Sequence, residues 1–292
     1  MEVVVQIVNA FIDGDSGGNH AGVVVDANML TSAQKLAVAQ QVGLSETAFV
    51  SASNAAAIKL EFFTPTRQIA HCGHATVATF SLLRQLGVIS DGPSSKETID
   101  GNRDILLKGD MAFMEQRAPR YSQLVLGSVA CTRALSSLAI RAEQLIEGLM
   151  PCIVNTGNSF LIIPLNEETA VRGLEPEFGA VEKLSEELDL IGYYAFSRAT
   201  KIGGRVAGAR MFAPRFGIRE EAGTGMAAGP LACFLHDFLG VKERRLLIEQ
   251  GWLMPSPSPS VIAVDLEITE GRIVRIMAGG KAKAVRSMMI SV

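Results

Sequence analysis

The chain has 292 residues, of which 48% are hydrophobic and 20% charged, so it can bury a substantial core and is not a disordered segment. Its net charge is -3 with scattered Lys and Arg, which argues against nucleic acid as a partner. The first residues lack signal-peptide features, and no apolar run approaches the roughly 18 residues of a membrane span. The four cysteines show no paired spacing, so free thiols are expected. Together these features predict a soluble, cytoplasmic protein without membrane contact.

The first half of the chain is predicted to form short strands separated by two helices. Thr31 is expected to cap a helix that runs through Gln41 and stops at Gly43, and an apolar helix is expected over 76–86. The polar residues 91–95 are interpreted as an exposed connection. Strands, including a final hairpin, are expected at 3–8, 22–25, 58–63, 105–107 and 112–114.

The second half is predicted to repeat this succession of elements. Helices are expected near 135–149, over 178–188 and from about 225 to 239. The expected strands lie near 153, 160–163, 193–196, 205–212, 262–266, 273–276 and 285–292.

A weak internal repeat supports this organisation. Phe-Thr-Pro at 63–65 is followed by Cys-Gly-His-Ala-Thr at 72–76 and an apolar helix. Phe-Ala-Pro at 212–214 is followed by Ala-Gly-Thr-Gly-Met at 222–226 and another apolar helix. A duplication would give two similar lobes, each directing a helix N-terminus at a shared cleft. Chance similarity of two strand-loop-helix segments is the alternative.

The starts of the two apolar helices are candidate binding positions for a carboxylate. Helix N-termini present free backbone N–H groups and a partial positive charge, and glycine lets a ligand approach the backbone. Gly73, Gly223 and Gly225 occupy such positions. Many glycine turns merely connect elements, but two in matching places favour a shared ligand.

Three side chains in the first half are candidates for chemistry. Glu46 lies in an apolar run (LSETAFV, 44–50), where a carboxylate is costly unless it is paired or used; a solvated or capping glutamate is the alternative. Cys72 begins a helix, which lowers a thiol pKa, although inert buried cysteine is commoner. His74 could act as an acid–base group, but a histidine at a helix start that only bonds the backbone is the alternative. No metal-ligand spacing, phosphate loop or nucleophile elbow occurs, so no metal and no cofactor is predicted.

An ordered set of motifs resembles the PhzF-like proteins of phenazine biosynthesis over essentially the whole chain. The resemblance implies an α+β, diaminopimelate epimerase-like fold with two similar lobes, each a curved sheet wrapped round a central helix, and a homodimer. The implied lobes are 1–118 and 119–283, with a final strand near 284–292 that returns to the first. The motifs are VNAF (8–11), GN (18–19), LSETAF (44–49), FTP (63–65), CGHAT (72–76), FAP (212–214), TG (224–225) and AAGPL (227–231).

The same resemblance implies a cofactor-independent isomerase that shifts a proton on a small carboxylate-bearing substrate. Glu46 would transfer the proton, His74 would bind substrate or relay protons, and Glu221 would replace a family aspartate. The implied substrate-binding residues are Ser45, Gly73, Gly225, Met226 and Asn19.

Departures from the family pattern affect the substrate more than the fold. Glutamate at 221 replaces aspartate, His20 replaces proline, and Met226 replaces a common serine. A second thiol, as in diaminopimelate epimerase, is expected at Ala222 and is missing.

Two alternative functions remain open. One is an amino-acid racemase or epimerase that uses Cys72 with Glu46 or Glu221, and the other is a non-catalytic binding member of the fold.

Overall fold

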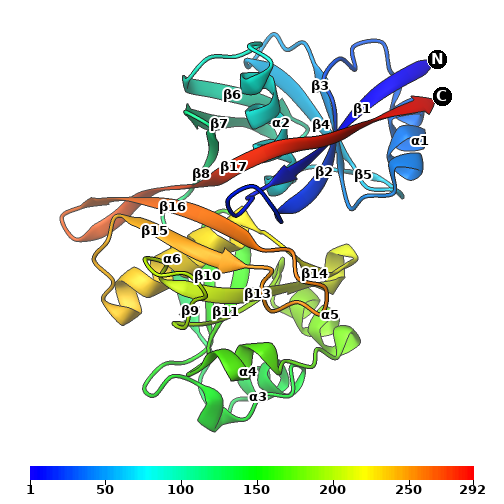
Figure 1. Ribbon diagram of the computed structural model, residues 1–292. Coiled ribbons are helices and arrows are strands. Elements are labelled where there is room, and N and C mark those ends of the chain that lie inside the picture. The colour runs from blue at the N-terminus through cyan, green and yellow to red at the C-terminus, as the bar shows by residue number, and fades with distance from the viewer. The chain divides into compact units, whose positions relative to one another are not determined.

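The computed structural model describes residues 1–292, and the chain divides into two units (Figure 1). Unit 1 consists of residues 1–115 and 279–292, and unit 2 consists of residues 116–278. None of the helices combines the length and the apolar character that crossing a membrane would require.

Unit 1 is built on one succession of paired strands. Strand β1 pairs antiparallel with β2, β2 parallel with β3, and β3 antiparallel with β4. Strand β4 then pairs antiparallel with β5 and parallel with β6, and β6, β7 and β8 continue antiparallel. The elements are β1 (Glu2–Ala10), β2 (Asn19–Val24), α1 (Ser32–Val42), β3 (Thr47–Ser51), β4 (Ile58–Phe63), β5 (Gln68–Ile69), α2 (Gly73–Gln85), β6 (Gly92–Thr98), β7 (Gly101–Lys108) and β8 (Met111–Gln116).

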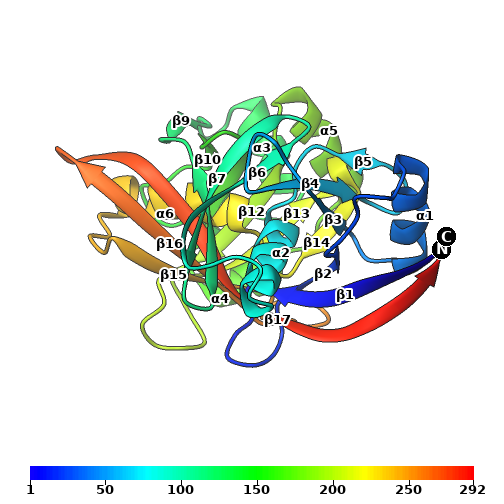
Figure 2. The same cartoon turned by 90° about the horizontal axis from the view of Figure 1, so that it is seen from above.

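Unit 2 follows a similar order. Its elements are β9 (Arg120–Gln123), α3 (Val129–Ser136), η1 (Ala142–Gln144), β10 (Cys152–Asn155), β11 (Ser159–Pro164), α4 (Glu168–Arg172), α5 (Phe178–Glu187), β12 (Gly192–Ser197), β13 (Ala207–Ala213), η2 (Pro214–Phe216), β14 (Ile218–Glu221), α6 (Gly225–Leu239), β15 (Arg245–Gln250) and β16 (Ser260–Thr269). The last strand, β17 (Arg272–Ser291), begins in unit 2 and ends in unit 1, where it pairs with β1. The two chain ends therefore lie side by side in both views (Figures 1 and 2).

The strand pairings of unit 1 recur in unit 2. Strands β10 and β11 are antiparallel, β11 and β12 parallel, and β12 and β13 antiparallel. Strand β13 pairs antiparallel with β14 and parallel with β15, and β15 pairs antiparallel with β16. The sequence repeat at the Phe-Thr-Pro and Phe-Ala-Pro motifs thus coincides with a repeated order of strands.

One buried helix lies at the centre of each succession. In α2 every residue from Gly73 to Leu83 is buried, and the helix contacts β1, β2, β3 and β7. Helix α6 is mostly buried and contacts β10, β11 and β16. Strands therefore cover both helices on several sides, as is typical of helices buried at the centre of a protein.

Several predicted elements are confirmed. Thr31 caps α1 in a capping box with Gln34, and Gly43 ends the helix with a φ of 68°, a left-handed conformation that glycine adopts without strain. The helix predicted over 225–239 is α6, and the hairpin predicted around 109–110 is formed by β7 and β8.

The helix predicted near 135–149 is wrong. Helix α3 begins earlier, where the Ser128 side chain accepts a hydrogen bond from the Cys131 backbone N–H, and it ends at Ser136. The Ser137 hydroxyl donates to the Ala134 carbonyl, and Ala139 has a φ of 57°, so the chain leaves the helical path there. Only η1 follows before β10.

The interpretation of 91–95 as an exposed connection is also wrong. Residues 92–98 form β6, which pairs with both β4 and β7. The strand lacks an apolar alternation because its buried side chains are Lys96 and Thr98. The two strands predicted at 273–276 and 285–292 are one strand, β17, in which Gly279 permits a close approach: a Cβ there would lie 2.1 Å from the Ala112 carbonyl oxygen.

Candidate active site

Glu46 is placed by the end of α1 and the start of β3. After α1 stops at Gly43, residues 44–46 lead into β3, and the Gly22 backbone N–H donates to the Glu46 carbonyl oxygen at 3.1 Å. This bond continues the parallel pairing of β2 and β3 and fixes the backbone of Glu46. The residue is only 4% exposed, so its carboxylate lies inside unit 1.

The N-terminus of α2 supplies two side chains to the same place. His74 Nε2 lies 3.3 Å from Glu46 Oε2, and His74 Nδ1 lies 3.6 Å from Cys72 Sγ. His74 and Cys72 are 3% and 5% exposed. The imidazole therefore stands between a carboxylate and a thiol, and either ring nitrogen can donate, depending on the tautomer. Such a set can accept, hold and return protons.

The same three side chains also form the one group of His, Cys and acidic donors in the structure close enough to share a metal ion. Their donor atoms lie within 4.8 Å of one another, and zinc accepts carboxylate, thiolate and imidazole ligands. Sequence spacing did not predict this set, because Glu46 is distant from Cys72 along the chain.

The other predicted residues of unit 1 surround these elements unequally. Asn19 is buried at the start of β2, Gly73 is the buried first residue of α2, and Ser45 is exposed. Gly18 has a φ of +88°, and a Cβ on it would lie 2.7 Å from the Ala10 carbonyl oxygen, so only glycine fits this turn. The pKa of His20 is lowered by desolvation and by the charge of His74.

In unit 2 a buried network holds the turn before α6. Glu221 is 8% exposed and its carboxylate accepts a hydrogen bond from the Thr224 hydroxyl. The Gln250 amide donates to the Glu221 carbonyl oxygen at 2.6 Å and accepts from the Thr224 N–H at 3.0 Å. The Tyr194 hydroxyl also donates to Gln250, at 2.9 Å. Burial, followed by the charge of Glu221, raises the pKa of Tyr194.

The starts of the two central helices can be compared directly. Cys72 is the N-cap of α2 and Thr224 the N-cap of α6, so the place of Cys72 in unit 2 is taken by Thr224. The expectation that Ala222 holds this place is wrong, because it ignored the two extra residues that precede α6. Neither residue is a thiol. Gly225 matches Gly73, and the half-buried Met226 matches His74.

Sequence reasoning missed Lys96, which lies on β6. It is completely buried, its ammonium donates to the Thr76 hydroxyl at 2.6 Å, and it lies 3.2 Å from His71 Nδ1. Burial lowers the pKa of Lys96 from 10.5 to about 7, with Arg103 acting in the same direction and Cys72 and Asp100 opposing. Burial and the charges of Lys96 and Arg103 also lower the pKa of His71 well below 6.5. No sequence signal marked Lys96, which directly follows the residues 91–95 that were interpreted as an exposed connection.

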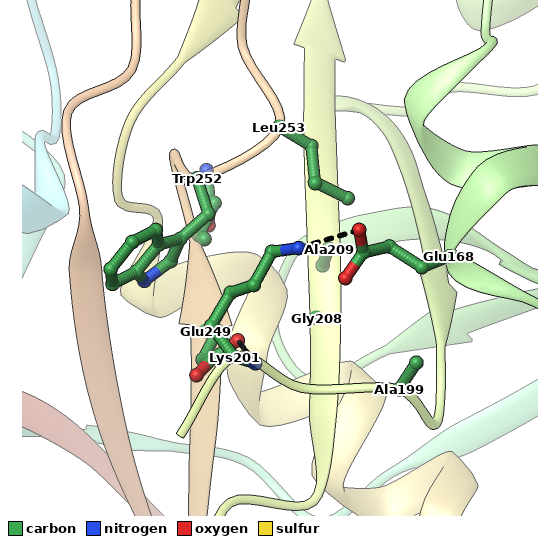
Figure 3. A pocket seen from close by; sticks show the side chains of 9 residues that line it. Glu168, Ala199, Lys201, Gly208, Ala209, Glu249, Trp252 and Leu253 are labelled. Carbon is green, nitrogen blue, oxygen red and sulfur yellow. Dashed lines mark hydrogen bonds and ion pairs between the residues drawn. The ribbon is translucent and has the colours of Figure 1, made fainter.

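A small hollow that is partly open to solvent lies in unit 2 (Figure 3). An ion pair of 2.6 Å between Lys201 and Glu168 crosses it. The carboxylate of Glu249, which lines the hollow, accepts hydrogen bonds from the backbone N–H groups of Lys201 and Ile202. None of the predicted site residues lines this hollow, whose lining consists of Glu168, Ala199, Lys201, Gly208, Ala209, Glu249, Gln250, Trp252 and Leu253.

Comparison with known proteins identifies the family. Residues 8–288 match the family described as phenazine biosynthesis-like protein, PhzC-PhzF. The chain belongs to the PhzC-PhzF family. The resemblance noted in the motifs is thereby confirmed.

Several relatives of this PhzC-PhzF protein are named isomerases. A Deinococcus radiodurans protein named as an uncharacterized isomerase is 31% identical, over 96% of this chain and 92% of its own length. The trans-2,3-dihydro-3-hydroxyanthranilate isomerase of Pseudomonas chlororaphis is 28% identical over 78% of both chains. The crystal structure of a PhzF family protein of Bacillus anthracis superposes with a TM-score of 0.87, covering 100% of both chains at 23% identity, and so has the same fold.

The lowered pKa of Lys96 predicts a pH-dependent stability. Between pH 7 and 10.5 the unfolded chain binds more protons at Lys96 than the folded one, so raising the pH favours the folded protein. Relative to Lys96→Met, the unfolding free energy of the wild type should therefore rise across this window, by on the order of a few kcal/mol. Urea unfolding of both proteins at several pH values measures this difference. Parallel curves would contradict it.

Proposed function

We propose that this protein is a cofactor-independent isomerase that shifts a proton within a small carboxylate-bearing substrate, with Glu46 as the proton-transferring group. The observation that supports this most is the 3.3 Å contact between the buried Glu46 carboxylate and His74. A buried carboxylate next to an imidazole is a pair that can take up a proton and return it. The family relatives named isomerases support the same class of reaction.

In the proposed reaction Glu46 removes a proton from one carbon of the substrate and returns it to another. His74, in contact with the carboxylate, would orient it and stabilise charge during the transfer. The backbone N–H groups of the first turn of α2, which begins at Gly73, would bind a substrate carboxylate, since the N-terminus of a helix attracts negative charge. Asn19 and Ser45 are proposed as further substrate contacts in unit 1.

In unit 2, Glu221, Gly225 and Met226 are proposed to contribute to substrate recognition. Support comes from the position of Gly225 and Met226 in the first turn of α6, matching Gly73 and His74 in α2. We also infer that the two units are the two lobes of a diaminopimelate epimerase-like fold. The repeated strand order and the central helices α2 and α6 support that inference.

One observation favours a second candidate function, an amino-acid racemase or epimerase. Cys72 Sγ lies 3.6 Å from His74 Nδ1, so the imidazole could accept the thiol proton and make Cys72 a base. A racemase must serve both faces of the reacting carbon, and Thr224 stands at the matching place in unit 2.

Glu46→Gln tests the proposed role of the carboxylate. The amide keeps the shape of glutamate but cannot shuttle a proton, and loss of a general acid–base group typically costs about 10²–10⁴-fold in rate. Candidate carboxylates can be screened in D₂O for deuterium incorporation by mass spectrometry. Glu97→Gln makes the same chemical change on a partly buried glutamate of unit 1 and should retain activity. Full activity of folded Glu46→Gln would refute the mechanism. Elemental analysis, for metals, and an absorbance scan, for organic cofactors, of the active, dialysed protein test cofactor independence separately.

Cys72→Ala separates the isomerase from the racemase. In the isomerase the thiol does not exchange a proton with substrate, so turnover should stay within about tenfold of the wild type. The small exposed fraction of Cys72, 5%, leaves a modest packing loss to be measured by thermal unfolding. A rate loss of several orders of magnitude at unchanged stability would support the racemase.

Glu221→Asp tests whether the substrate differs from dihydro-hydroxyanthranilate. Glutamate carries its carboxylate one methylene farther from the backbone than aspartate, roughly 1.5 Å, and a misplacement of about 1 Å can cost about 10²-fold. The wild type should convert dihydro-hydroxyanthranilate poorly, and Glu221→Asp should convert it better. Steady-state rates of both proteins provide the measurement. Efficient turnover by the wild type that falls in Glu221→Asp would show that the natural substrate is that compound or a close analogue.

A further inference from the structure

Lys96 is bonded on both sides of the segment that carries Cys72 and His74. Its ammonium donates to the Thr76 hydroxyl at 2.6 Å, and that hydroxyl donates to the Cys72 carbonyl oxygen, also at 2.6 Å. On the other side the ammonium lies 3.2 Å from His71 Nδ1. It also stands 4.9 Å from the centre of the Phe62 ring. One buried group on β6 thus holds the residues directly before and after the turn.

The charge of Lys96 is unusual because no carboxylate forms an ion pair with it. The other buried lysine of unit 1, Lys35, is paired with Glu61. Burying an ammonium without a carboxylate is costly, so a fold would not retain Lys96 for stability. Its neighbours supply a hydroxyl, an imidazole and an aromatic face, which all orient the ammonium without neutralising it.

Unit 2 shows that the fold does not need this polar pair. Thr76 and Ala228 are each the fourth residue after the N-cap of their helix. Lys96 pairs with Ile58, and Ile248 pairs with Ala207, which lies as far before Phe212 as Ile58 lies before Phe63. Ala228 and Ile248 are both fully buried. The places of Thr76 and Lys96 are therefore apolar in the unit that lacks counterparts of Glu46 and His74.

We propose that Lys96 is a positioning residue for the Glu46 and His74 site, acting through Thr76 and His71 on the turn at the start of α2. This inference rests on the proposed function for the identity of the site, but its geometric part can be tested without a substrate. The turn sets the distances from His74 to Glu46 and to Cys72. A shift of about 1 Å in such a group can cost about 10²-fold in rate, so a residue that fixes the turn influences catalysis without touching the substrate.

The test converts the pair in unit 1 into the pair found in unit 2, with the double variant Thr76→Ala/Lys96→Ile. The chain has four histidines, so imidazole NMR signals can be assigned by replacing each in turn with glutamine. In the double variant we expect the His74 signal to shift and amide exchange over 71–76 to rise by about tenfold or more, at unchanged or higher thermal stability. A purely structural lysine would instead lower stability and leave the His74 signal in place.

Thr76→Val and Thr76→Ser provide a second test that spares Lys96. Valine removes the hydroxyl at nearly constant shape and should move the His74 signal, whereas serine keeps the hydroxyl and should not. Lys35→Met is the matched control: it leaves Glu61 buried without its partner, so it should lower stability without moving the His74 signal. An unmoved His74 signal in both Thr76→Val and the double variant would overturn the proposal.

Turnover separates this inference from the proposed function. On a substrate identified with the wild type, the double variant should lose about tenfold or more in kcat with a smaller change in KM. If Glu46→Gln abolishes activity while the double variant keeps the wild-type kcat and His74 signal, the positioning role fails and the proposed function stands. If Glu46→Gln is fully active while the His74 signal still moves in the double variant, the proposed function fails. The inference that Lys96 positions the turn then stands, without an assigned reaction.

Discussion

The contact between Glu46 and His74 joins two parts of unit 1 that are distant in sequence. Glu46 is fixed by the pairing of β2 with β3, and His74 by the start of the buried helix α2. Both side chains are almost completely buried, so the surrounding strands must seal them from water while keeping them within hydrogen-bonding range. That requirement accounts for the buried polar groups around the first turn of α2.

The repeat shows that scaffold and chemistry are separable. The register of β3 with β4 matches that of β12 with β13, which puts Gly192 at the place of Glu46. A Cβ on Gly192 would lie 2.3 Å from the Phe212 carbonyl oxygen, so no side chain fits there. Met226 stands where His74 does. Unit 2 keeps the strand order and the buried helix while lacking the acid–base pair, so the pair belongs to unit 1 and is not a requirement of the fold.

Local signals were sufficient where one element determines its own ends. The capping box at Thr31 and the glycine at 43 define α1, and the apolar run of 225–239 defines α6. Motif order singled out Glu46 and His74, and the structure brings the two side chains within 3.3 Å of each other. Prediction from the sequence failed where tertiary contacts determine the local structure. Strand β6 is polar because neighbouring strands and α2 satisfy its buried side chains, and no periodicity in 92–98 could reveal that Lys96 points inward. Helix α3 was misplaced because serine hydroxyls end it early.

The two units hold their corresponding turns with groups of different chemistry. In unit 2 the turn before α6 is held by the amide of Gln250, which bonds Glu221 and Thr224 and does not titrate. In unit 1 the turn is held by an ammonium whose pKa is about 7. Hydrogen bonds from a charged donor are stronger than those from a neutral one, so the contact of Lys96 with Thr76 weakens as the pH rises through that value. An amide would have held the α2 turn equally at all pH values. The hydrogen bond that holds the turn carrying His74 therefore depends on proton concentration, and this turn lies beside the pair proposed to move protons.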